Sequence, residues 1–294
     1  MIDRILILGT GLLGSSTGLA LRAAGFKGSI AGWDKDPKQS RDALELKAID
    51  SIAANPLASA EASQLILLST PVYAILDWME QLAGVLGPSH LVTDVGSTKS
   101  VITSTGNRLF NKPGSAGFLP GHPMAGKEVG GAAQADAALF QGAVWIFTSG
   151  SEPISPDADS AVMSFQAAEL AASWRSWIEA IGCRTLDLAA GRHDELVAWV
   201  SHLPQFLSTA LTALLETEVG DAPELTAVGG RALREMTRLG SSPYGMWRDV
   251  AYTNTEAIAA TIAALEQRLA HLRENLRTPE LREEFDLANR FRKG

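Results

Sequence analysis

The sequence predicts an α/β domain with a mostly parallel sheet, followed by an all-helical domain. Near the N-terminus a glycine-rich turn joins a short apolar run to a helical run. Strand-like and helical segments then alternate to about residue 189, and beyond it strand signals disappear. With about 150 residues per domain, 294 residues suggest two domains or one large one. We therefore expect a first domain over residues 1–189 and a second over residues 190–294.

Composition and charge exclude several classes of protein. With 46% hydrophobic and 20% charged residues, the chain is typical of a globular protein and not of a disordered one. Its formal net charge of −8 argues against general binding to nucleic acid or to anionic membranes. The N-terminus has neither the basic leader of a signal peptide nor an apolar run long enough to span a membrane. We expect a cytoplasmic protein.

The single cysteine, Cys183, excludes an intrachain disulfide and a cysteine-cluster metal site. It lies at the start of a strand-like run, which favours a buried structural thiol, and an activated thiol is the alternative. We predict no metal site.

The first element is the apolar run 5–8, which is typical of a strand buried on both faces of a parallel sheet. The turn that follows has glycine at Gly9, Gly11 and Gly14, with Leu12 and Leu13 between the last two. The first glycine permits the tight turn, the second lets a pyrophosphate approach the backbone, and the third lets the helix pack on the strand. The helix N-terminus faces the negative charge. These five residues are predicted to bind a dinucleotide.

The second apolar stretch, 29–33, ends at Asp34, which lies 20 residues after Gly14. A dinucleotide-binding domain places a carboxylate there to accept hydrogen bonds from the adenine ribose, and that charge favours NAD over NADP. The alternative is that Asp34 only caps the helix that follows Pro37. Strand, glycines, helix, strand and acid in this order predict a Rossmann-type domain.

Further elements follow in order. We expect strands at 65–69, 91–95, 117–121, 143–147 and 184–188, helices at 72–86, 98–109 and 158–181, and a surface loop at Ser151–Asp159. In the second domain, helices should break near 220–223, 240–243 and 278–279. The apolar stripe over 257–276 fits either an internal core or a subunit interface, and we favour a homodimer.

Ligands of open α/β sheets bind beyond the carboxyl ends of the strands. Three segments lie at such ends, and their candidate residues are Ser69, Thr70 and Pro71, then Gly96 and Ser97, then His122 with Lys127 and Glu128 after it. His122 is the most suggestive, because an imidazole with a pKa near 6.5 can take the proton of a hydroxyl while hydride leaves the same carbon. The alternative is a loop histidine that only binds the backbone.

Polar and aromatic residues of the helical domain are the remaining candidates. Pro204 bends a helix-like stretch, so His202 and Gln205 beside it are expected to point into a cleft. Arg238 is a candidate to bind a substrate carboxylate, and Trp247 lies further on. A solvated helix face is the alternative for any single arginine.

Taken together, these segments resemble the prephenate dehydrogenase family, which includes arogenate and cyclohexadienyl dehydrogenases of tyrosine biosynthesis. The matching stretches run in family order over nearly the whole chain: 9–14, 69–72, 94–99, 121–126, 201–204, and 237–238 through 246–249. The His-Pro-Met-Ala-Gly and Ser-His-Leu-Pro segments are more specific than the glycine motif, which many dehydrogenases share.

The resemblance implies a reaction and a set of roles. His122 would hydrogen-bond the ring hydroxyl of the substrate and assist hydride transfer to NAD. Ser97 would orient that histidine, the hydroxyl or the nicotinamide, and Arg238 would bind a substrate carboxylate. The pocket would be lined by His202 and Trp247, with Glu128 at its mouth. Loss of hydride and of carbon dioxide creates an aromatic ring, so the enzyme mainly positions and polarises its substrate.

Two positions depart from the family pattern. Gln205 replaces a second histidine, which puts the identity of the substrate side chain in doubt. Lys127 replaces a threonine or serine, and its charge would suit the dianionic prephenate better than arogenate. We also expect no appended regulatory domain or fused mutase. The alternatives are an arogenate or dual-substrate cyclohexadienyl dehydrogenase, another β-hydroxyacid or imine-type dehydrogenase, and a non-catalytic NAD-sensing protein.

Overall fold

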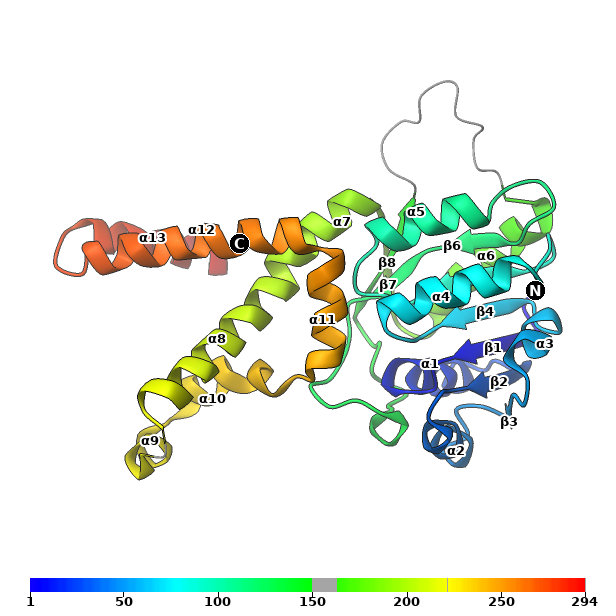
Figure 1. Ribbon diagram of the computed structural model, residues 1–294, viewed down its shortest axis with the longest axis horizontal. Helices are drawn as coiled ribbons and strands as arrows, with labels where there is room; N and C mark the ends of the chain where they lie inside the picture. Colours follow the sequence, from blue (N-terminus) through cyan, green and yellow to red (C-terminus); the bar gives the residue numbers. More distant parts are fainter. Residues whose placement is uncertain (150–162, 221, 294) are drawn as a thin grey trace, which may run out of the picture.

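The computed structural model describes residues 1–149, 163–220 and 222–293. They form an α/β half and an elongated helical half that projects away from it (Figure 1). The main sheet has six parallel strands in the order β3-β2-β1-β4-β5-β6. Its chain order reverses between β1 and β4, so their carboxyl ends flank the crevice where such sheets bind ligands. The predicted Rossmann-type fold is confirmed.

The elements of this half follow the sequence closely. The strands of the main sheet are β1 (Arg4–Leu8), β2 (Ser29–Trp33), β3 (Ser51–Ile52), β4 (Leu65–Leu68), β5 (Leu91–Asp94) and β6 (Gly117–Leu119). The helices are α1 (Leu12–Ala23), α2 (Pro37–Glu45), α3 (Pro56–Glu61), α4 (Val72–Ala83), α5 (Ser100–Leu109) and α6 (Phe165–Ala180), with a 3₁₀ turn η1 (Ala132–Gln134). The short strand β3, helix α3 and the turn η1 were not predicted, and residues 158–162 of the predicted helix 158–181 lie outside the described residues.

Helices cover both faces of the sheet, as the unbroken apolar strands require. Successive side chains of a strand point to opposite faces, so Ile5 and Ile7 pack in one core cluster and Leu6 and Leu8 in another. The first cluster includes residues of α1, α2 and α6, and the second includes residues of α3, α4 and α5. The two clusters together fix the strand ends that carry the site.

The prediction of a single strand over residues 117–121 is wrong. Residues 117–121 do not form a single strand, because the chain leaves the main sheet at Pro120 and continues as β7 (Gly121–Pro123). Strand β7 pairs antiparallel with β8 (Val144–Ser149), and β8 pairs parallel with β9 (Arg184–Ala189), which makes a second, three-stranded sheet. A proline has no N–H to donate to the ladder, which favours a change of sheet there.

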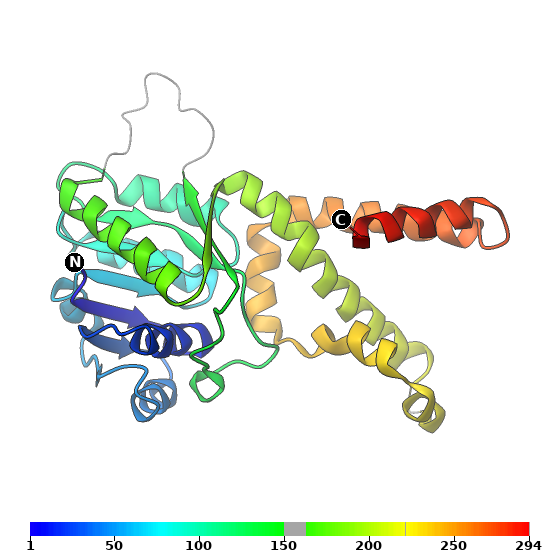
Figure 2. The same cartoon turned by 180° about the vertical axis from the view of Figure 1, so that it is seen from behind.

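Beyond β9 the described chain is helical, in agreement with the prediction. Its elements are α7 (Ala190–Val197), η2 (Ala198–His202), α8 (Leu203–Glu218), α9 (Pro223–Val228), α10 (Arg231–Thr237), η3 (Arg238–Ser241), α11 (Tyr244–Thr253), α12 (Thr255–Glu274) and α13 (Glu280–Lys293). Figure 2 shows α12 and α13 as a hairpin that extends beyond the α/β half. The predicted breaks near 220, 240 and 278 are present.

The stretch around Pro204 differs from the expected interruption. Helices α7 and α8 are joined by η2, a π-helical turn, and Pro204 lies in the first turn of α8. The N–H of Leu203 donates to the Ala198 carbonyl oxygen five residues back, so the irregular turn lies directly before the proline, which has no N–H to continue a regular helix. Short π-helical turns are frequent at functional sites.

Four further predictions concern Cys183, membrane spans, metal sites and the loop Ser151–Asp159. Cys183 is buried, and its burial raises the pKa of its thiol to about 11, in agreement with a structural cysteine. Among the described residues no helix is long and apolar enough to cross a membrane, and no group of three metal-ligating side chains is found. The predicted loop Ser151–Asp159 lies outside the described residues.

Candidate active site

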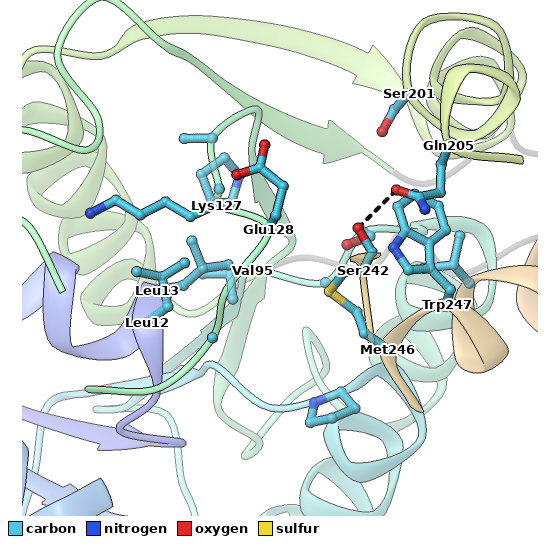
Figure 3. Close-up of a pocket in the computed structure, with 18 of the residues that line it drawn as sticks. Leu12, Leu13, Val95, Lys127, Glu128, Ser201, Gln205, Ser242, Met246 and Trp247 are labelled. Atoms are coloured by element: carbon cyan, nitrogen blue, oxygen red, sulfur yellow. Dashed lines mark hydrogen bonds between the residues drawn. The ribbon is translucent and has the colours of Figure 1, made fainter. Parts of the chain in front are cut away.

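A cavity of about 610 Å³ lies between the carboxyl ends of the main sheet and the helical half. In Figure 3, Leu12, Leu13 and Val95 lie on one side of it and Gln205, Ser242, Met246 and Trp247 on the other. Of the predicted site residues, the cavity is lined by Leu12, Leu13, Ser69, Thr70, Pro71, Gly96, Ser97, His122, Lys127, Glu128, His202, Gln205, Arg238 and Trp247.

Gly9, Gly11 and Gly14 do not line the cavity but build the turn beneath it. Gly9 has φ +98°, and a Cβ there would lie 2.2 Å from the Ser69 carbonyl oxygen. A Cβ on Gly14 would lie 2.0 Å from the Gly9 carbonyl oxygen. Both positions therefore require glycine. In contrast, a Cβ on Gly11 would meet nothing within 4 Å, so the N-terminus of α1 opens onto free space that a pyrophosphate fits.

Asp34 follows β2 and stabilises the same turn. One carboxylate oxygen accepts a hydrogen bond from the Thr10 N–H at 2.9 Å and the other from the Asp36 N–H at 3.0 Å. The alternative role of capping the next helix is wrong, because Asp36 is the residue that caps α2. Asp34 is partly exposed at the end of β2, where an adenine ribose binds in dinucleotide-binding folds.

Several polar atoms near the cavity are enclosed without a hydrogen-bond partner among the described residues. They are the hydroxyls of Ser69 and Thr70 and the indole Nε1 of Trp247. Buried polar atoms are nearly always satisfied, so these are positions for a ligand or ordered water to occupy. They lie on both walls, which fits a cavity that holds two molecules.

A buried ion pair fixes the loops under the cavity. The Lys99 ammonium contacts the Asp94 carboxylate and donates to the Gly121 carbonyl oxygen at 2.7 Å. Asp94 accepts from the N–H groups of Gly96 and Gly121, at 2.8 and 3.1 Å. Burial lowers the pKa of Lys99, and the Asp94 carboxylate opposes that shift. The pair thereby ties the end of β5 to the start of β7, next to His122.

His122 is buried on β7, and its Nδ1 lies 2.8 Å from Nε2 of His193. Burial is the main cause that lowers the pKa of His122 well below 6.5, and repulsion between its protonated form and the other basic groups His193, Lys99 and His202 adds to the shift. The imidazole is therefore neutral at pH 7. Its Nε2 has no partner among the described residues, and because the residue lines the cavity that nitrogen is open to a ligand.

His202 ends the π-helical turn and has a different partner. The side-chain amide nitrogen of Asn254 donates to the Asp194 carbonyl oxygen at 2.8 Å. The same nitrogen lies 3.3 Å from His202 Nδ1, and because an amide nitrogen can only donate, Nδ1 is the acceptor. Burial lowers the pKa of His202 to about 4. Neutral His202 therefore carries its proton on Nε2, where it can donate to a ligand.

The remaining candidates have partners of their own. Gln205 donates to the Leu239 carbonyl oxygen at 2.7 Å and accepts from the Ser242 hydroxyl at 3.1 Å (Figure 3), so its amide fixes the turn that carries Arg238. Arg238 forms an ion pair with Glu128 across the cavity. Lys127 donates to the Gln134 carbonyl oxygen at 2.9 Å and extends toward the side of Leu12 and Leu13.

Sequence reasoning missed the hydrogen-bonded neighbours of His122. No hydrogen bond joins Ser97 to His122 among the described residues, and His193 occupies that role in this structure. His193 and Asp194 form an adjacent titratable pair four residues into a helix that follows a strand. Their hydrogen-bond partners lie about 70 to 95 positions earlier in the chain, so the sequence did not indicate these contacts. The adjacent His-Asp pair was the one local feature that could have marked these residues as candidates.

The fold and the cavity define a dinucleotide-dependent dehydrogenase with a separate helical domain. A dinucleotide fits the open turn at Gly11, and a neutral histidine faces the space beside it. The comparisons refine this class. Residues 17–161 match the model of the prephenate dehydrogenase nucleotide-binding domain, and residues 189–292 match that of the prephenate dehydrogenase dimerization domain.

The chain belongs to the prephenate dehydrogenase family. It is 27% identical over 274 residues to the prephenate dehydrogenase of Lactococcus lactis and 29% identical over 260 residues to that of Bacillus subtilis. These alignments cover 93% and 88% of the chain but only 70% and 66% of the two relatives. The family and its nucleotide-binding domain confirm the predicted class of cofactor, and they decide against another β-hydroxyacid or imine-type dehydrogenase.

Solved structures give the same result. An Aquifex aeolicus prephenate dehydrogenase, in complex with hydroxyphenyl propionate and NAD+, is 29% identical with a TM-score of 0.79, over 100% of this chain and 96% of that one. Arogenate dehydrogenase from Synechocystis is 28% identical with a TM-score of 0.74, over 99% of each chain. Enzymes for both substrates therefore share this fold at the same level of identity.

Proposed function

We propose that the protein catalyses the oxidative decarboxylation of prephenate to 4-hydroxyphenylpyruvate with NAD as hydride acceptor, a step of tyrosine biosynthesis. The observation that carries the proposal is the neutral His122 imidazole in a cavity shared by the dinucleotide-binding turn and the helical half. NAD supplies the hydride acceptor when bound. Gly9, Gly11, Leu12, Leu13, Gly14 and Asp34 would hold it, together with Ser69, Thr70, Pro71 and Gly96.

The proposed reaction would proceed in a fixed order of steps. His122 accepts the proton of the ring hydroxyl as hydride leaves the same carbon, so that a carbonyl forms. The carbon–carbon bond to the ring carboxylate then breaks, and its electron pair completes the aromatic ring as carbon dioxide leaves. The proton returns to the phenolate oxygen. Ser97 would orient the reacting groups.

Binding of the substrate carboxylates would come from the helical half. Arg238 can bind a carboxylate with two parallel N–H groups, and the ligand would compete with Glu128 for it. His202 offers an N–H, and Trp247 forms a wall beside His202, with ring centroids 5.9 Å apart. Lys127 would add positive charge near the cavity.

Arogenate is the second candidate substrate, alone or together with prephenate. The similarity to an arogenate dehydrogenase favours keeping it, and the amide of Gln205 is occupied within the protein, so it does not select between the two side chains. Reduction of NAD or NADP should be measured with prephenate and with arogenate. Turnover with prephenate and NAD supports the proposal, and turnover with arogenate alone contradicts the substrate assignment.

The distant alternative, a protein that only senses NAD, needs no His122. We expect His122→Asn to lower kcat by about 10²- to 10⁴-fold, the usual contribution of a general base, and to leave the Kd for NAD unchanged. Calorimetry would measure that Kd. Unchanged kcat in the variant, or turnover in neither protein, would favour the sensor.

A homodimer through the helical half is part of the proposal. The second matching family model is a dimerization domain, and α8 to α13 expose many large apolar side chains. A cytoplasmic location and the domain limits 1–189 and 190–294 stay predictions.

A further inference from the structure

Three buried side chains form a line that starts at the cavity. His122 Nδ1 lies 2.8 Å from His193 Nε2, and His193 Nδ1 lies 2.8 Å from Asp194 Oδ1. The residues are 8%, 0% and 4% exposed, so water does not compete for these bonds. Neither His193 nor Asp194 lines the cavity.

The far end of the line determines where its protons lie. Asp194 accepts from the Lys99 N–H at 2.7 Å and from the Ser100 N–H at 2.8 Å. Burial opposes ionisation of Asp194, but its hydrogen bonds from His193, Ser100 and Lys99 outweigh burial and lower its pKa. Asp194 is therefore a carboxylate, which can only accept hydrogen bonds.

The direction of each bond follows. Because Asp194 only accepts, His193 must donate to it from Nδ1. His193 is neutral, since burial lowers its pKa, and its Nε2 then has a lone pair and no proton. The 2.8 Å contact is a hydrogen bond only if His122 donates to it from Nδ1. A neutral imidazole has one proton, so Nε2 of His122 is left as an acceptor facing the cavity.

We propose that His193 and Asp194 are positioning residues that hold His122 in its Nδ1–H tautomer, so that Nε2 accepts the proton of the substrate hydroxyl. This rests on the proposed function. When that O–H bond breaks and the Nε2–H bond forms, His122 becomes positively charged, and the Asp194 carboxylate stabilises the charge through His193. An imidazole without this partner would lose both orientation and stabilisation.

Asp194 also joins the two halves of the molecule. The N–H groups that it accepts from begin α5, directly after the loop of Gly96 and Ser97. Asp194 itself lies on α7, at the start of the helical part. The tautomer of His122 is thus fixed by the same contact that seats α7 on the nucleotide-binding half.

The direct test is the ¹⁵N spectrum of the full-length protein labelled at histidine, recorded near pH 7 without substrate. Protonated and unprotonated ring nitrogens have well separated shifts, and His122→Asn identifies the signals of His122. We expect Nδ1 protonated and Nε2 unprotonated in the unaltered protein. A proton on Nε2 would overturn the proposal, whatever the enzyme assay shows.

A pair of variants tests the consequence. His193→Leu removes the acceptor for Nδ1–H, and His193→Gln keeps an oxygen near the position of Nε2. We expect His193→Leu to lower kcat at least about tenfold with little change in KM, and His193→Gln to restore most of it and the Nδ1–H signal. Equal losses in both variants with an unchanged tautomer would contradict a positioning role. The surface substitution His271→Leu is the matched control.

A protein that turns over no prephenate or arogenate, but shows the expected tautomer, would overturn the proposed function and leave the Nδ1–H assignment standing. The reverse result, activity with His122 protonated on Nε2, would do the opposite. The two proposals therefore fail separately.

Discussion

The nucleotide-binding half and the helical half bury their apolar residues very differently. Both clusters of buried apolar residues lie between Ile2 and Cys183. From residue 190 on, the buried apolar residues are only Ala190, Val197, Ala198, Val250 and Ile258 among those described. The exposed ones include Trp199, Leu214, Val228, Tyr252, Leu269, Leu276, Phe285 and Phe291.

The difference teaches where each half gets its stability. A half with two packed clusters can fold around its own core, and many exposed large apolar side chains on the other are typical of an interface. The apolar stripe of α12 shows the transition within one helix, because Ile258 is buried and Leu269 is half exposed. The proposed homodimer would cover its outer part.

The largest effect is expected at the proposed dimer interface, where this comparison of the two halves is tested most directly. Phe285 on α13 is 63% exposed and Phe165 on α6 is 77% exposed. Burying a phenylalanine contributes about 1.5–3 kcal/mol, and a two-fold interface contains it twice, so Phe285→Asp should raise the dimer Kd by about 100-fold or more. Sedimentation velocity measures it.

Phe165→Asp is the matched control in the other half, and we expect no change of oligomeric state. If Phe165→Asp dissociates the dimer and Phe285→Asp does not, the assignment of the two surfaces is reversed.

The next effect concerns the buried histidine that belongs to the helical half. The pKa of His202 is about 4 in the folded protein, below its ordinary value of 6.5. The contribution of neutral His202 to stability is fully present above pH 6.5. As pH falls from 6.5, the unfolded chain binds this proton first, so the free energy of unfolding decreases until about pH 4. The loss from His202 is about 3 kcal/mol.

Urea unfolding at pH 7, 5 and 4 checks this. His202→Gln should lose less stability between pH 7 and 4 than the unaltered protein, and the exposed His271→Gln should lose the same amount. An equal loss in the His202 variant would mean that this histidine titrates normally in the folded protein.

A smaller effect is expected in the nucleotide-binding half. Asp34→Asn removes the charge that we propose repels a 2′-phosphate, and it would weaken the proposed hydrogen bonds to the ribose. A hydrogen bond to a charged group contributes about 1.5–3 kcal/mol, so the ratio of kcat/KM for NAD over NADP should fall at least about tenfold. Asp36→Asn, two positions away on the cap of α2, should leave this ratio unchanged. An unaltered ratio in Asp34→Asn would remove Asp34 from cofactor selection.

The smallest effect is expected at Lys127. Its side chain is 32% exposed, and its ammonium already donates to the Gln134 carbonyl oxygen and lies 3.6 Å from the Asp136 carboxylate. A partly exposed pair contributes about 0.2–1 kcal/mol, so Lys127→Thr should raise the KM for prephenate by about two- to fivefold and that for arogenate less. Lys112→Thr, on a distant loop, is the control. Equal changes for both substrates would contradict selection by Lys127.

Local patterns were enough where neighbours in sequence are neighbours in space. The turn at Gly9, Gly11 and Gly14 was predictable because a strand, a tight turn and a helix follow one another directly. Pro204 likewise marked the region in which His202 faces the cavity. The split of 117–121 between two sheets was not predictable, because each half of that stretch pairs with a strand far away in the chain.

The sequence by itself determined the class of fold, the glycine turn of the nucleotide-binding domain and most of the candidate residues that line the cavity, because periodicity and short-range spacing encode them. The tertiary structure alone decided how those residues are poised. His193 and Asp194 reach His122 and the start of α5 across 71 to 95 positions of sequence, and Lys99 reaches Gly121 across 22. The protonation and orientation of a side chain depend on burial and on such distant partners, and neither is written in its local sequence.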